Sequence, residues 1–171
     1  MAIPAYMSIY GTRQKQITEN ASSELSIGDG YQKGHENQVM LQSVSHNIII
    51  PRDPQTGQPT GKRIHQPFIV TKGFDKSSPL LQVALTKGEV LELVVIEWYR
   101  PTSQGGRVHY YTTTLEGAIL VSMTSFMHDC QDASKGHYSH MEELQFTYRK
   151  ISWEHKLSNT TGQSDWRDPD E

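Results

Sequence analysis

The stretch EVLELVVIEWY, residues Glu89–Tyr99, decides the fold class because it is dense in β-branched and aromatic side chains, which favour strands. Successive side chains of a strand point to opposite faces of a sheet. Apolar side chains occupy both parities of this stretch: Leu91, Leu93, Val94, Val95, Ile96 and Trp98. We therefore expect a strand covered on both sides, and we interpret Leu93, Val95 and Trp98 as core residues or as a contact between subunits.

Strand signals recur on both sides of this stretch, separated by segments rich in glycine, proline and serine. Further strands are expected over Ala5–Tyr10, Asn37–Ile50, Lys62–Thr71, Arg107–Phe126 and Met141–His155. We expect Arg107–Phe126 to form two strands separated near Gly117. The apolar parity of Met141–His155 switches along its length, which predicts a bulge or bend near Arg149 and Lys150.

The segment Asn37–Ile50 has an apolar parity and a more polar one, as in an antiparallel strand with one solvated side. The apolar parity consists of Met40, Val44, Ile48 and Ile50. The more polar parity consists of Leu41, Ser43 and Ser45.

A single helix is expected in FDKSSPLLQVALTKG, residues 74–88. Asp75, Ser77 or Ser78 can cap its first N–H groups, and Pro79 suits a first helical turn. Gly88 can adopt the left-handed conformation that ends a helix. The sequence thus predicts a mainly β fold, a two-sheet barrel or sandwich, with one flanking α-helix.

The chain of 171 residues fits one domain, which we place at residues 1–158. Gly11–Glu36 is expected to be a long surface segment because it lacks apolar periodicity. Residues 159–171 are polar, and the last part is acidic, so we expect a mobile tail.

The charge balance and the distribution of apolar residues argue against a nucleic-acid partner and against a membrane segment. Lys and Arg number 16 against 19 Asp and Glu, so no basic excess suggests a nucleic-acid partner. The start of the chain lacks the pattern of a secretory signal, and no apolar run is long enough to span a bilayer. We expect synthesis in the cytoplasm, no membrane insertion, and any export by a route without a cleavable signal peptide.

A polar cluster, MHDCQDASKGHYSHMEE, could hold a metal ion through His128, Cys130, His137 and His140. Its spacing, H-x-C-x6-H-x2-H, matches no common zinc finger, and Cys130 is the only cysteine. A surface loop is the favoured interpretation, so we expect no metal and no cofactor. A metal-stabilised domain or metal-dependent enzyme stays as an alternative.

Nothing in the sequence frames a catalytic nucleophile, since no G-x-S-x-G elbow is present. The glycine-rich turns lead into strands and not into helices, so they are unsuited to cradle phosphates. We expect a protein without enzymatic activity. A monomeric β-sandwich binding module remains a further alternative.

The connection in IIIPRDPQTGQPTGKRIH, Ile48–His65, is far longer than a hairpin turn requires. Its three prolines restrict the chain, and its two glycines allow it to turn. This combination predicts an extended hairpin loop that is stiff enough to project from the protein.

Several separated motifs resemble one family in the same order along the chain: MAIPAYM, HNIIIPRDPQTGQPTGKRIHQPF, DKSSPLL, IEWYRP, YYTTTLEGA, MHD and YRKISWEHK. These motifs are similar to those of the haemolysin-coregulated proteins (Hcp), the tube proteins of the bacterial type VI secretion system. The resemblance extends from Met1 to about Lys156.

The resemblance implies a phage-tail-tube-like fold and subunits that form homohexameric rings. The rings would stack into a tube inside a contractile sheath, meet a trimeric spike protein and carry effector proteins in the ring lumen. Lumen contacts would come from Leu41, Ser43 and Ser45. Contacts between rings would come from Arg52, Asp53, Pro54, Gln55, Gln58, Lys62 and Arg63.

Overall fold

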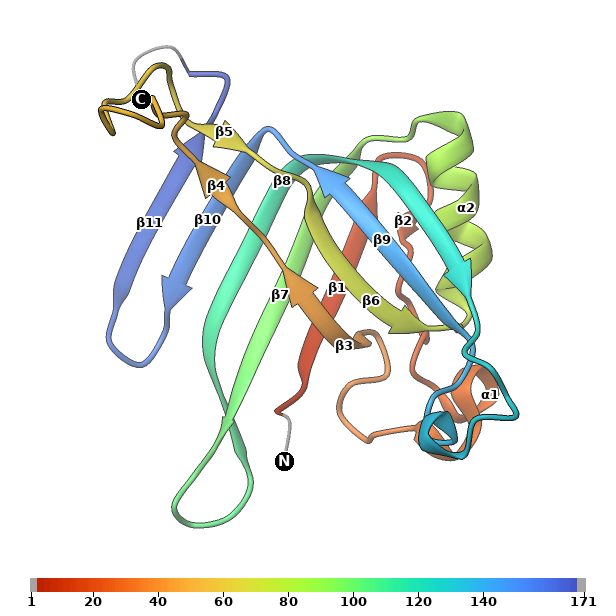
Figure 1. Ribbon diagram of the computed structural model, residues 1–171. Coiled ribbons are helices and arrows are strands. Elements are labelled where there is room, and N and C mark those ends of the chain that lie inside the picture. Colours follow the sequence, from red (N-terminus) through yellow and green to blue (C-terminus); the bar gives the residue numbers. More distant parts are fainter. Residues whose placement is uncertain (1–2, 169–171) are drawn as a thin grey trace.

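The computed structural model describes residues 3–168 (Figure 1). The strands are β1 (Ala5–Gly11), β2 (Lys15–Gln16), β3 (Val39–Ser45), β4 (Ile48–Ile49), β5 (Ile64–His65), β6 (Phe68–Gly73), β7 (Leu91–Pro101), β8 (Arg107–Phe126), β9 (Met141–Thr147), β10 (Lys150–His155) and β11 (Thr160–Asp165). The α-helices are α1 (Glu24–Ile27) and α2 (Ser77–Lys87). Two short 3-10 turns cover Gly28–Gly30 and Ala133–Lys135.

The main sheet closes on itself. Its strand order is β11-β10-β8-β7-β1-β3-β6-β9. The last strand of this order, β9, also pairs with β8, and this pairing closes the strands from β8 to β9 into a barrel. All the pairs are antiparallel, and β4 and β5 form a separate two-stranded ribbon. Figure 1 shows the resulting barrel with α2 along its flank. The predicted mainly β, barrel-like fold is confirmed.

The strand β8 explains the closure, and it corrects one expectation. Arg107–Phe126 is one strand of 20 residues and not two strands separated at Gly117. Its first part pairs with β7 and β10, and its second part pairs with β9. Gly117 has φ of 60°, and a Cβ there would lie 3.3 Å from Cβ of Arg149. Gly117 therefore bends β8 from one wall of the barrel to the other and does not end the strand.

Inside the barrel, β-branched, aliphatic and aromatic side chains form one core. Val94 and Ile96 of β7 are fully buried there, together with Leu115 of β8 and Phe146 of β9. The helix α2 adds Leu81 and Ala84 to this core and ends at Gly88, which is left-handed as predicted. The predicted bend near Arg149 and Lys150 is also confirmed, because β9 ends at Thr147 and β10 begins at Lys150.

A buried ion network ties the start of α2 to the barrel wall. Lys72 of β6 has no exposed surface, and its Nζ lies 3.1 Å from Oδ1 of Asp75. The same Nζ contacts the carboxylate of Glu142 and donates to the carbonyl oxygen of Gly73 and to Oγ of Ser78. Asp75 and Glu142 are almost completely buried as well.

The segment Gly11–Glu36 is more integrated than expected. Ile17 and Ala21 are buried, and the N–H of Ile17 donates to the carbonyl oxygen of Ile9 at 3.0 Å. The carboxylate of Glu89 accepts the N–H groups of Arg13 and Gln14, which fixes the start of the segment. Short apolar anchors without periodicity hold this segment, so periodicity could not reveal them.

The first half of the segment expected to be a tail is part of the sheet. Thr160–Asp165 forms β11, which pairs with β10 along its whole length. Residues 169–171, the end of that expected tail, lie outside the described residues. Within residues 3–168, no helix is long and apolar enough to cross a membrane.

Candidate functional site

Strand β3 places the predicted lumen residues on different sides. Ser43 and Ser45 are exposed, as expected, but Leu41 is 5% exposed and belongs to the core. The pairing of β3 with β6 shifts register between Leu41 and Ser43. This irregularity adds one residue to β3. Side chains of the parity that faces the core before the irregularity therefore face outward after the irregularity. Leu41 is therefore a core residue and not a candidate for a contact on the outer surface.

Ser43 and Ser45 are part of a larger surface. Residues paired across β3, β6, β9 and β8 point to the same side of the sheet. We call this surface the outer polar face; it consists of Ser43, Thr71, Glu143 and Thr124 in one row, and Ser45, Ile69, Gln145 and Ser122 in the next. None of the eight is buried, whereas the intervening row of Val44, Val70, Leu144 and Met123 packs toward the core.

Hydroxyl and amide groups dominate the outer polar face. Glu143 is its one charged residue, and its Oε1 accepts a hydrogen bond from Nε2 of Gln145 at 3.1 Å. The sequence pointed only to the two serines. The alternation in FIVTKG and EELQFT puts Thr71 and Gln145 on one side of their own strands but does not indicate which strands pair. The face can make many weak polar contacts, and its eight residues include no nucleophile held by a base.

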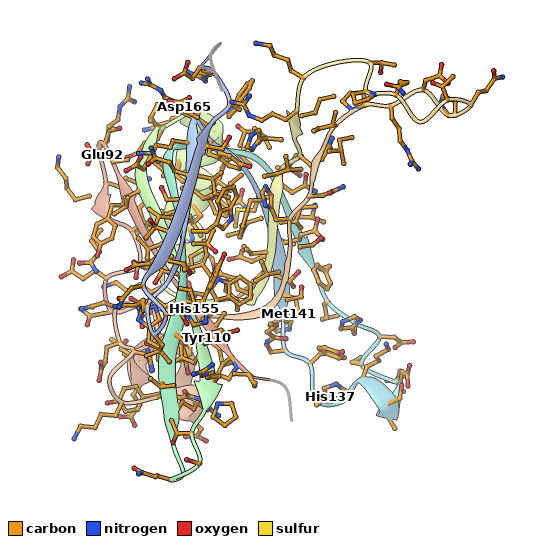
Figure 2. The ribbon with its side chains drawn as sticks, turned by 90° about the vertical axis from the view of Figure 1, so that its left-hand side faces the viewer. Glu92, Tyr110, His137, Met141, His155 and Asp165 are labelled. Carbon is orange, nitrogen blue, oxygen red and sulfur yellow. The ribbon has the colours of Figure 1, made fainter. Side chains whose placement is uncertain are left out.

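The predicted extended hairpin is present, and backbone hydrogen bonds join its two legs. The N–H of Asp53 donates to the carbonyl oxygen of Gln58 at 2.8 Å, and the N–H of Thr60 donates to that of Pro51 at 2.8 Å. Arg52 and Pro59 form an isolated bridge. Figure 2 shows this hairpin, between β4 and β5, extending far from the barrel at the upper right. Its stiffness therefore comes from a ladder of backbone bonds as well as from its prolines.

The side chains predicted for contacts between rings divide into two groups. Five are exposed along the hairpin: Arg52, Pro54, Gln55, Gln58 and Lys62. The other two hold the hairpin in shape. The carboxylate of Asp53 accepts the N–H groups of Thr56 and Gln55, and these bonds lower the pKa of Asp53. Arg63 donates from Nε to Oγ of Ser164 at 3.2 Å and from Nη2 to the carbonyl oxygen of Asp165 at 2.9 Å.

The strand residues Leu93, Val95 and Trp98 also lie on different faces. Trp98 packs against the core, and its Nε1 donates to Oγ1 of Thr113 at 3.0 Å. Leu93 and Val95 are half-buried on the opposite face of β7. The expectation of apolar cover on both sides of β7 agrees with this burial, and Leu93 and Val95 remain candidates for a subunit contact.

The cluster proposed as an alternative metal site is not assembled. Between residues 3 and 168, no three His, Cys, Asp or Glu side chains are placed to hold a metal ion. Instead, His128 and His137 both lie against the ring of Tyr138, with ring centroids 4.4 and 4.1 Å apart. His140 lies near Phe74, and Cys130 is exposed. Figure 2 shows His137 at the lower right, at the end of the protein away from the hairpin.

A cavity of about 320 Å³ opens at this same end. Its wall includes Tyr6, Ile27, Val39, Met40 and Phe74. The strand β6 begins beside the hairpin and ends next to Phe74, so the hairpin and the cavity lie at opposite ends of the barrel (Figure 1).

Comparison with known proteins identifies the group to which this architecture belongs. The family model described as "Type VI secretion system effector, Hcp" matches residues 6–155. The chain belongs to the Hcp family. It is 57% identical over 169 residues to the "Major exported protein" of Pseudomonas aeruginosa, covering 99% of this chain and 98% of that protein.

Solved Hcp structures share the fold closely. A crystal structure of an Hcp protein, 43% identical, superimposes with a TM-score of 0.94 and covers 98% of this chain and 99% of its own. The secreted protein Hcp3 from Pseudomonas aeruginosa is 48% identical, with a TM-score of 0.83 over 98% of this chain and 100% of its own. These similarities confirm the family that the sequence motifs indicated.

Proposed function

We propose that this Hcp protein is the tube subunit of a type VI secretion system and forms hexameric rings that stack and carry effector proteins. Family membership across residues 6–155 is the observation that carries the proposal. The proposed function is structural, and the projecting hairpin and the outer polar face offer surfaces for contacts with other copies and with cargo. The relative named "Major exported protein" supports export from the cell. The export that we propose starts from the cytoplasm.

The outer polar face is suited to line the ring lumen. The lining of a channel for different proteins must bind each of them weakly and stay hydrated. Hydroxyl and amide groups provide such a lining because they leave no large apolar patch. Ser43 and Ser45 lie at one edge of this face, with Glu143 and Gln145 near its middle. We therefore extend the lumen assignment from the two serines to the whole face.

Stacking of rings requires a contact between two different surfaces of neighbouring copies. The hairpin at one end of the barrel and the cavity near Phe74 at the other end are such surfaces. The exposed hairpin residues, among them Arg52 and Lys62, would meet the next ring. The sheath would surround the tube, and a trimeric spike would cover its end.

Deleting Asp53–Thr60 tests the stacking role. These residues make bonds only within the hairpin among the contacts described, so the barrel should still fold. We expect single rings of six subunits with few stacks, whereas a Thr56→Ser variant, which keeps the hairpin and the hydroxyl that bonds within it, should stack normally. Negative-stain images and light scattering would measure both properties. Normal tubes after the deletion would refute the hairpin's role, and a strict monomer from the unaltered chain would refute the tube function itself.

A further inference from the structure

Two histidines and one tyrosine meet at the base of the hairpin. His46 lies in the connection between β3 and β4, His65 lies in β5, and Tyr148 lies in the bend between β9 and β10. Nε2 of His46 and Nδ1 of His65 are each 2.7 Å from the hydroxyl oxygen of Tyr148. These residues join the two legs of the hairpin to the barrel wall, and the proposed tube function makes no use of them. We call this group the hairpin clamp.

The clamp extends to β11 through two further hydrogen bonds. Nε of Arg63 can only donate, and it lies 3.2 Å from Oγ of Ser164. Oγ of Ser164 lies 3.3 Å from Nε2 of His65. If Ser164 donates to His65, then His65 donates from Nδ1 to Tyr148, and Tyr148 donates to Nε2 of His46. This arrangement gives each of these three hydrogen bonds one donor and one acceptor, and it requires both imidazoles to be neutral.

The surroundings disfavour a positive charge in the clamp. Burial, followed by the nearby His65, lowers the pKa of His46 below its ordinary value of 6.5. Burial also raises the pKa of Tyr148, which is 3% exposed and so keeps its proton. Phe68 of β6 contributes only an aromatic ring, 5.0 Å from that of His46.

The charged groups at the edge of the clamp do not stabilise a cationic His46. Arg63 brings a positive charge to the side of His65. Asp165 of β11 is engaged by Arg149, whose Nε lies 3.2 Å from Oδ2, and its carbonyl oxygen accepts from Arg63. Tyr148, Phe68 and His65 lie against His46, and none of these three residues carries a carboxylate.

We propose that His46, Tyr148 and His65 form a proton-sensitive clamp that fixes the hairpin near neutral pH and releases its base in mildly acidic solution. A proton added at Nε2 of His46 removes the acceptor of the Tyr148 hydroxyl. In the arrangement above, the new N–H of His46 and the O–H of Tyr148 then face each other as two donors. The buried hydroxyl then loses its partner, or the two imidazoles separate. Either change loosens the hairpin from the barrel.

The direction of the pH effect follows from linkage. The released hairpin leaves His46 in water, with an ordinary pKa near 6.5, whereas the closed clamp lowers that pKa. The open form therefore binds more protons, and it gains population as the pH falls through 6.5. Resting on the proposed function, the same event would weaken stacking of rings at acidic pH.

Amide hydrogen exchange at Gln66 tests the clamp, because its N–H donates to the carbonyl oxygen of Asn47 across the hairpin base at 3.0 Å. After correction for intrinsic exchange, its protection should fall between pH 7.5 and 5.5. The limit is about tenfold for one histidine of ordinary pKa near 6.5. The N–H of Asp53, bonded within the tip, reports whether the tip itself opens.

His46→Gln is the informative variant. Its side-chain oxygen can still accept from Tyr148 but does not titrate, so Gln66 should keep its protection at pH 5.5. His137→Gln, at the other end of the protein, should behave as the unaltered chain (Figure 2). A pH-independent Gln66 in the unaltered chain, or an unchanged pH dependence in His46→Gln, overturns the proposal.

A second measurement needs no variant. The imidazole signals of His46 should titrate below 6.5, and titration of His46 at its ordinary value would also overturn the proposal. Both measurements use dispersed protein and do not require stacked rings. If the chain never forms rings, the proposed tube function is refuted, but the measurements on the clamp remain valid.

Discussion

Replacing Lys72 with methionine removes the cation that separates two buried carboxylates. Lys72 has no exposed surface, and Asp75 and Glu142 are exposed by only 3% and 1%. Methionine fills most of the same space, so the loss is mainly electrostatic. Breaking such a buried network from one side costs about 3–5 kcal/mol of the free energy of unfolding. At this chain length that corresponds to a decrease in Tm of roughly 6–20 °C.

Urea unfolding at one fixed protein concentration would measure this loss, because assembly also contributes to stability. Lys150→Met is the matched control, since the Lys150–Glu116 pair is 31% and 45% exposed and should change stability by less than about 1 kcal/mol. A double variant, Lys72→Met with Glu142→Leu, should recover much of the loss because it removes one of the stranded charges. A loss below about 1 kcal/mol for Lys72→Met would refute the reasoning.

Three further predictions concern Glu89 and β7. Burial alone would raise the pKa of Glu89, but hydrogen bonds from Gln14 and Arg13 outweigh it and hold the pKa below the ordinary 4.5. This stabilisation is present above pH 4.5 and is lost as the pH falls, so Glu89→Gln should flatten the stability curve between pH 5 and 3; identical slopes would contradict it. Trp98→Asp should abolish soluble folding, since it loses the core packing and buries a charge, at a cost above about 3 kcal/mol. Leu93→Asp, on the opposite face, should damage assembly more than folding, as measured by light scattering and circular dichroism.

Much of the fold could be predicted because its signals are local. The apolar run in β7, the capped helix α2 and the long proline-rich hairpin each depend on neighbouring residues. The outer polar face was found only in part, since Thr71 and Gln145 join Ser43 and Ser45 through pairing between strands. Such pairing leaves little trace in any one segment.

The amino-acid sequence by itself determined that this chain forms strands, one substantial helix and a projecting hairpin, and its motifs indicated the family. Only the tertiary structure decided which way Leu41 points, because a register shift in β3 reverses the parity. It also made β8 one strand through Gly117 and gave the polar residues of β11 a partner in β10. Barrel closure brings Tyr148 to within 2.7 Å of His46, 102 residues earlier, and no local pattern encodes that distance.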